Sequence, residues 1–148
     1  LMKIASELLI LTREHHTALS LGNKCVNSAK RNDQQEISEL CLKISENFKM
    51  DFHEHFDTEE STIFVFLSDK STELTQLCEQ LTQEHQELYD LAENLPKNPQ
   101  TLEKFGKLLK SHARTEDRQL FPNIELLSSS QRQAILDSST QHASAIKV

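Results

Sequence analysis

Apolar side chains recur every three or four positions along four long stretches of the chain, at about residues 3–31, 33–68, 72–95 and 100–127. This period places the apolar side chains on one face of an α-helix, so each stretch is expected to form a helix that buries this face. The breaks between the stretches contain residues that cap or end helices, namely Asn32-Asp33, Ser71-Thr72 and Pro-Lys-Asn-Pro at 96–99. Because short connections make consecutive helices antiparallel, the pattern predicts an all-α fold, an up-down-up-down four-helix bundle.

The end of the chain differs from these stretches. Residues 128–148 are polar, although 131–138 could form a short extra C-terminal helix. At 148 residues the chain has the size of one ordinary domain. A single domain over 1–148 is therefore expected, with the bundle at about 3–127 and the polar tail at 128–148.

The composition supports a helical protein and narrows its partners. The chain has two glycines and three prolines, fewer than turn-rich β folds need. Its net charge of −7 argues against binding to nucleic acid or to an anionic membrane surface. No apolar run reaches the roughly 20 residues that span a bilayer. No nucleic-acid or membrane partner is expected.

The cysteines and the start of the chain predict a cytoplasmic protein. The three cysteines, Cys25, Cys41 and Cys78, are odd in number and form no CxxC pair, which is typical of reduced thiols that pack in a core. The first residues lack the apolar core of a secretory signal.

Histidine and glutamate lie within the apolar faces. Each face contains one histidine, and two faces contain a glutamate one turn later; the six residues are His15, His55, Glu59, His85, His112 and Glu116. A carboxylate is costly to bury unless it is paired or bound to a metal ion. In His-x-x-x-Glu the imidazole and the carboxylate share one helix face, so both can reach the same metal ion or neighbouring ions.

The two halves of the chain repeat this arrangement. Leu-Thr-Arg-Glu-His at 11–15 matches Leu-Thr-Gln-Glu-His at 81–85, and the His-x-x-x-Glu segment at 55–64 matches that at 112–121. Two such hairpins facing each other about a pseudo-twofold axis would bring four imidazoles and two carboxylates to one centre. This set suits two octahedral metal ions bridged by both carboxylates, since structural zinc prefers four ligands. The alternative is a hydrogen-bonded polar core.

These motifs resemble those of the hemerythrin-like family, also called the HHE cation-binding domain, over about residues 8–127. The most specific are Leu-Thr-Arg-Glu-His at 11–15, His-Phe and Glu-Glu within 55–60, and His112 followed by Glu-Asp and Leu-Phe-Pro within 116–122. The resemblance implies a four-helix bundle around two oxo- or hydroxo-bridged iron ions, with manganese or zinc as alternative metals. The four histidines would then be terminal ligands, and Glu59 and Glu116 would be the bridging carboxylates.

Two departures from the family pattern affect what the resemblance implies. Oxygen-carrying hemerythrins have a further histidine one turn after the third-helix ligand, where this chain has Tyr89; the repeat-related residue is Leu19. The centre would therefore be more symmetric, with an additional open position or a nearby tyrosine. Val65 stands where the second copy has Pro122, so the second helix is expected to run straight past its ligands and the fourth to bend or end near Pro122.

The resemblance implies a protein that binds or senses oxygen, nitric oxide or peroxide at the di-iron centre. Two alternatives stay open: a di-iron redox enzyme that reduces peroxide or nitric oxide, and an iron donor in iron–sulfur cluster repair. A ferritin-like ferroxidase matches less well, because such bundles use Glu-x-x-His and more carboxylates.

Other polar residues near the predicted ligands receive other assignments. Glu14 and Glu84 are candidates for orienting neighbouring imidazoles by hydrogen bonds. Tyr89 could be a hydrogen-bonded core residue or line the metal pocket. His16, His53 and His142 are expected to face solvent, with a role as an alternative ligand or as a partner of a ligand left open for His16. Glu60 and Asp117 are expected to face solvent or other helices.

Overall fold

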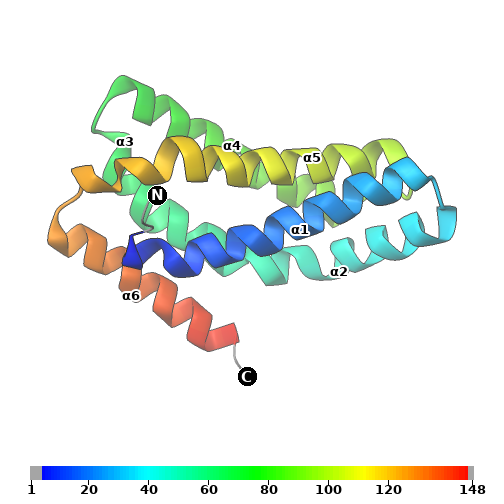
Figure 1. The fold of residues 1–148 in the computed structure, drawn as a ribbon, viewed down its shortest axis with the longest axis horizontal. Coiled ribbons are helices and arrows are strands. Elements are labelled where there is room, and N and C mark those ends of the chain that lie inside the picture. The colour runs from blue at the N-terminus through cyan, green and yellow to red at the C-terminus, as the bar shows by residue number, and fades with distance from the viewer. Residues whose placement is uncertain (1–4, 147–148) are drawn as a thin grey trace.

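Four long antiparallel helices form the body of the molecule, as the sequence predicts. The computed structural model describes residues 5–146, so Lys3 and Ile4, where the first helix was expected to begin, lie outside the described residues. Figure 1 shows the long helices side by side, with a further helix at an angle across one end. The helices are α1 (Leu9–Arg31), α2 (Gln34–Thr58), α3 (Phe64–Ser68), α4 (Thr72–Glu93), α5 (Pro99–Thr115) and α6 (Ser129–Ile146), with a short 3₁₀ helix (Ser6–Leu8) before α1.

The helix ends follow from local side-chain chemistry. Asn32 ends α1 in the left-handed conformation at φ 54°, which asparagine tolerates better than most residues. The carboxylate of Asp33 accepts hydrogen bonds from two backbone N–H groups in the first turn of α2. Ser71 caps α4 and Asn98 caps α5 in the same way, and Pro99 occupies the first turn of α5. The predicted breaks are therefore confirmed.

Two apolar clusters fill the bundle, one on each side of the predicted ligands along its length. Phe48, Leu88 and Phe105 belong to one cluster, and Leu11 and Leu81 belong to the other. The three cysteines are buried and free, as expected for packing residues. Burial raises the pKa of the Cys25 thiol to about 12, which keeps it protonated and unreactive at neutral pH.

The second helix runs past its ligands to Ser68 without a break, as expected, but it is not a regular α-helix throughout. A π-helical turn (Glu59–Ile63) separates α2 from α3, and a matching turn (Glu116–Leu120) follows α5. Each π turn begins at a predicted bridging glutamate, in keeping with the frequent occurrence of such turns at functional sites. The second turn continues into a 3₁₀ helix (Phe121–Leu126) that contains Pro122, so the fourth helix ends close to this proline, as expected.

The C-terminal helix α6 is longer than the predicted segment at 131–138, and it is part of the packed structure. Ile135 and Ser139 are fully buried, and His142 is 6% exposed. Arg132 pairs with Glu7 beside α1. The polar composition of this segment therefore concealed a buried face. None of the helices within residues 5–146 is long and apolar enough to cross a membrane.

Candidate metal centre

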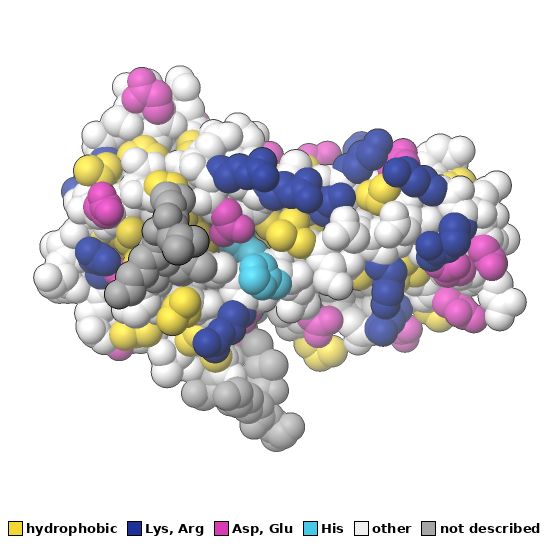
Figure 2. Space-filling view, in the orientation of Figure 1, with side chains coloured by type: hydrophobic (Ala, Val, Ile, Leu, Met, Phe, Trp, Pro, Cys, Tyr) yellow, Lys and Arg dark blue, Asp and Glu magenta, His cyan; other side chains and the backbone are white. Residues whose placement is uncertain are grey.

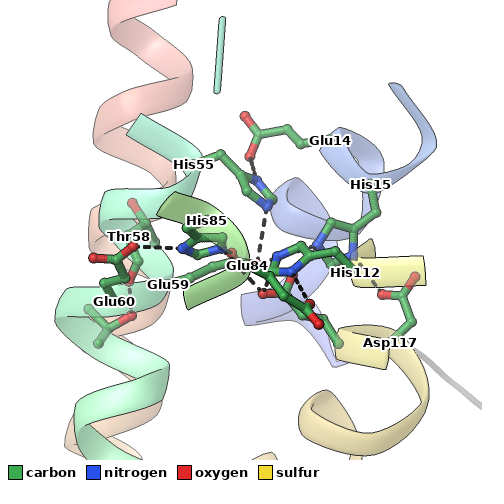
Figure 3. Close-up of polar contacts among 12 residues, drawn as sticks. Glu14, His15, His55, Thr58, Glu59, Glu60, Glu84, His85, His112 and Asp117 are labelled. Atoms are coloured by element: carbon green, nitrogen blue, oxygen red, sulfur yellow. Dashed lines mark hydrogen bonds and ion pairs between the residues drawn. The ribbon is translucent and has the colours of Figure 1, made fainter. Parts of the chain in front are cut away.

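The six predicted ligands converge at the middle of the bundle. His15 lies on α1, His55 on α2, His85 on α4 and His112 on α5, while Glu59 and Glu116 begin the two π turns. Figure 3 shows the imidazoles directed toward a common centre from different helices. None of the six side chains belongs to a residue more than 3% exposed.

The six residues form two overlapping groups. His15 and His55 lie with both glutamates in one group, and His85 and His112 lie with the same glutamates in the other; within each group the ligand-type atoms lie within 4.8 Å of one another. Two metal ions could therefore share Glu59 and Glu116 while each takes its own pair of imidazoles.

Each glutamate presents one oxygen to each pair of histidines. The Oε2 of Glu59 lies 3.1 Å from the Nε2 of His55, and its Oε1 lies 3.1 Å from the Nε2 of His85. The Oε1 of Glu116 lies 2.7 Å from the Nε2 of His15, and its Oε2 lies 3.2 Å from the Nε2 of His112. A carboxylate placed in this way is oriented to bridge two ions.

The other ring nitrogen of every histidine contacts a further carboxylate. The Nδ1 atom lies 2.6–2.8 Å from a carboxylate oxygen in all four cases; the pairs are His15–Asp117, His55–Glu14, His85–Glu60 and His112–Glu84. Donation from Nδ1–H to a carboxylate fixes the ring orientation and leaves Nε2 to bind a metal ion. All four Nε2 atoms face the two central glutamates.

These four outer carboxylates obey the pseudo-twofold symmetry of the repeat. Glu14 and Glu84 each precede a ligand histidine and bond the second histidine of their own half, as predicted. Glu60 and Asp117 each follow a bridging glutamate and bond a histidine of the opposite half. Both are partly exposed, but the expectation that they only face solvent or other helices missed their contacts with the ligands. Their matched places in the two copies were the available signal.

The histidines and glutamates at the centre stabilise each other's charged forms. Burial by itself would lower the pKa of His85, but contacts with Glu116, Glu59 and Glu60 outweigh it and raise the pKa to about 11. Burial also opposes the charged form of His55, whereas Glu59 and Glu14 raise its pKa to about 9. Burial raises the pKa of Glu116, yet His112 and the other imidazoles hold it well below its ordinary range. Protonated imidazoles thus neutralise the carboxylates when no metal ion does so.

Several atoms at the centre lack hydrogen bonds. Within the described residues, the Nε2 of His112 and both carboxylate oxygens of Glu116 are buried without a hydrogen-bond partner, although oppositely charged groups lie nearby. Coordination to a metal ion would give these atoms partners in place of the poorly aligned ion pairs, so the donor set fits a pair of metal ions. Metal binding by the six residues stays a prediction.

His142 was expected to face solvent, and the structure shows that this was wrong. Its Nε2–H donates to Glu14, with both carboxylate oxygens at 2.9 Å, and its Nδ1 lies 2.8 Å from the Thr58 hydroxyl. Glu14 in turn contacts His55. Burial opposes ionisation of Glu14, but its bonds to His142 and His55 lower its pKa to about 2. Helix α6 therefore helps to position the carboxylate that orients one predicted ligand.

Replacing His142 with Ala is expected to weaken metal binding by up to about 10-fold: loss of a direct partner of a ligand typically costs 10–100-fold in affinity, and His142 acts one step further out, through Glu14. His142→Gln, which keeps a donor toward Glu14, should recover part of the loss. Metal titration of the folded variants measures the effect. His53→Ala is the control, since His53 is 52% exposed and pairs with Asp57 at the surface. Equal affinities for His142→Ala and the parent chain would contradict the assigned role.

Three further candidate residues, His16, His53 and Tyr89, are not among the six residues of the centre. His16 and His53 are exposed, as predicted. Tyr89 is partly buried; its ring contacts Phe48 and Phe56, and the Lys49 ammonium lies 5.7 Å from its centre. Tyr89 also lines a cavity that reaches His85.

The comparison with protein families agrees with this geometry. The sequence model of the family described as hemerythrin HHE cation binding domain matches residues 8–124 of this chain. No curated protein and no solved structure matches the chain. The family match includes all six residues of the centre, together with the four helices and the two π turns that carry them. The chain therefore belongs to the hemerythrin HHE cation-binding domain family, and its buried His/Glu clusters are suited to a site for two metal ions.

Proposed function

We propose that this chain binds two iron ions at the six-residue centre and uses them to bind a small molecule: oxygen, nitric oxide or peroxide. The observation that carries this proposal is the orientation of the histidines. Four separate carboxylates contact the four Nδ1 atoms, so that every Nε2 faces the centre. A polar core without a metal would not need all four rings to be oriented in one way.

The number and type of the side chains that would bind the metal ions favour iron over structural zinc. Structural zinc takes four ligands in a closed tetrahedral site, whereas six shared nitrogen and oxygen donors suit two ions of higher coordination number. Mixed imidazole and carboxylate ligands are typical of non-heme iron. Iron is also the metal that the family resemblance implies, with manganese as the nearest alternative.

The number of ligands supports binding of a small molecule. Each ion would receive two imidazole nitrogens and one oxygen from each bridging glutamate, which makes four ligands from the chain. Octahedral coordination has six positions, so each ion would keep open positions for solvent and for an exogenous ligand. Because the residues of the centre are almost fully buried, such a ligand would have to be small.

Metal content and the visible absorption spectrum test the proposal. Elemental analysis is expected to find about two irons per chain after anaerobic reconstitution with ferrous iron, since the two groups share both glutamates. Exposure to air should produce charge-transfer bands that bleach on reduction. Failure to retain a transition metal after reconstitution would mean that the six residues form a polar core.

One observation favours a redox enzyme as the second candidate. Tyr89 lines the cavity beside His85, and its burial and the nearby carboxylates raise the pKa of its phenol, which keeps it protonated. A protonated phenol can supply a proton and an electron to a ligand being reduced. Repeated consumption of peroxide or nitric oxide with an added reductant would support the enzyme, whereas one equivalent bound per centre would support a carrier or sensor.

A further inference from the structure

We propose that small neutral ligands reach the centre from one side only: through the cavity between α2 and α4 beside His85, and not through the pseudo-symmetric interface between α1 and α5. The biological role of this path rests on the proposed function, but the path itself does not require bound metal. Because the path ends beside His85, an ion held by His85 and His112 would be the first to meet an incoming ligand.

The repeat defines which interfaces correspond. The ligand histidines match α1 with α4 and α2 with α5, so the interface between α1 and α5 corresponds to that between α4 and α2. A symmetric molecule would have equal access through both. The contact between α1 and α5 is, however, far more extensive than that between α2 and α4. Figure 1 shows α1 and α5 lying against each other along much of their length.

Two glycines close the interface between α1 and α5. A Cβ atom on Gly22 would lie 2.9 Å from the carbonyl oxygen of Gly106 and would clash with Lys110. A Cβ atom on Gly106 would lie 2.7 Å from the Cβ of Cys25 and 2.8 Å from the carbonyl oxygen of Gly22. The two backbones therefore approach more closely than residues with a Cβ atom at these two positions would permit.

The corresponding positions on the other side carry larger residues. Seven residues after its ligand histidine, α4 has Ala92 where α1 has Gly22; six residues before its ligand, α2 has Lys49 where α5 has Gly106. Both Lys49 and Ala92 line a cavity of about 460 Å³ that extends to Tyr89 and His85. On this side, where larger residues stand in place of the glycine pair, a cavity reaches the predicted ligand His85.

The residues around this cavity favour neutral molecules over anions. Four carboxylates line it, those of Asp57, Glu60, Asp90 and Glu93, against one lysine and His53. Fields of one sign raise the local concentration of oppositely charged molecules and exclude those of like charge. Oxygen, nitric oxide and hydrogen peroxide are neutral, so this lining does not oppose their passage.

The basic face of the molecule does not offer an equivalent path. Figure 2 shows lysine and arginine side chains gathered along α5. A second hollow there, of about 290 Å³, is lined by residues that include Lys107, Lys110, Arg114 and Arg118, but by none of the six residues of the centre. It is therefore a feature of the surface, separate from the path beside His85.

Dissolved oxygen gives a test that does not depend on iron. Oxygen is paramagnetic, so it increases the relaxation rates of nuclei that it approaches, and NMR spectra under oxygen pressure can be recorded on the metal-free or zinc-loaded chain. We expect larger relaxation enhancement at His85 and Tyr89 than at the repeat-related His15 and Leu19. Equal enhancement at both pairs, or larger enhancement at His15 and Leu19, would overturn the proposal.

A matched pair of variants tests the path itself. Gln86 and His16 each follow a ligand histidine on the surface of its helix, but only Gln86 lines the cavity. Gln86→Trp should reduce the enhancement at Tyr89 and His85 to the level at Leu19, and His16→Trp should leave it unchanged. In the iron-loaded chain, Gln86→Trp should slow nitric oxide binding without changing metal content. No change with Gln86→Trp would reject the path, whereas loss of iron binding alone would reject only the proposed function.

Discussion

Replacing Glu59 with Ala is expected to abolish binding of the metal pair. Glu59 presents one oxygen to the His15–His55 group and the other to the His85 side, so its removal takes a ligand from both ions at once. The loss of affinity should exceed the roughly 10–100-fold that follows removal of an outer partner of a ligand. Glu116→Ala should have the same effect, because Glu116 is related to Glu59 by the repeat and contacts both groups.

Two variants on the same helix turn separate this effect from general damage. Asp57→Ala removes a carboxylate that is 64% exposed and should leave metal binding unchanged. Glu60→Ala removes the partner of His85 Nδ1 and should give an intermediate loss. Metal content of the purified variants and titration of the metal-free chains measure all three. Full loading of both ions in Glu59→Ala would show that Glu59 does not bridge them.

The helices and the six central residues were predictable because their signals are local or repeated. A buried ligand histidine occupies an apolar stripe, and the carboxylate one turn later shares its helix face. The caps Asp33 and Ser71 act on backbone groups within their own first turn. Such features need no knowledge of how distant segments meet.

The features that were missed depend on contacts between distant segments. The bond from His15 to Asp117 joins residues 102 positions apart, and that from His142 to Glu14 joins residues 128 apart. No periodic pattern along one helix indicates such partners. The π turns were missed because ordinary helical residues form them, and Ile135 alone gave little sign that α6 has a buried face. The glycine contact likewise becomes visible only when two backbones meet.

Removing the metal is expected to lower the stability of the bundle, and the loss should grow as the pH rises. A ligand present at 1,000 times its dissociation constant stabilises a protein by about 4 kcal/mol, which corresponds to roughly 8–16 °C in Tm for a chain of this size. Without metal, the buried carboxylates depend on protonated imidazoles for neutralisation. Four such protons carry the same charge as two divalent ions.

The sign of the pH dependence follows from the raised pKa values of the histidines. His55 and His85 have pKa values of about 9 and about 11 in the folded chain, against an ordinary value near 6.5. Between the ordinary pKa and the raised pKa of each histidine, the folded metal-free chain binds more protons than the unfolded chain. The contribution of these protons to stability is therefore complete below about pH 6.5 and is lost as the pH rises through about 9 toward 11. At the acid end, the lowered pKa of Glu14, about 2, adds stability above about pH 4.5 that is lost as the pH falls toward 2.

Bound metal should reverse the alkaline part of this dependence. A metal ion needs unprotonated imidazoles, so protons compete with it and its affinity rises with pH. The difference in Tm between the loaded and metal-free chains should therefore widen between pH 6.5 and 9, and calorimetry of both forms across this range measures it. Identical melting of loaded and metal-free chains throughout this range would mean that these histidines exchange no protons for metal.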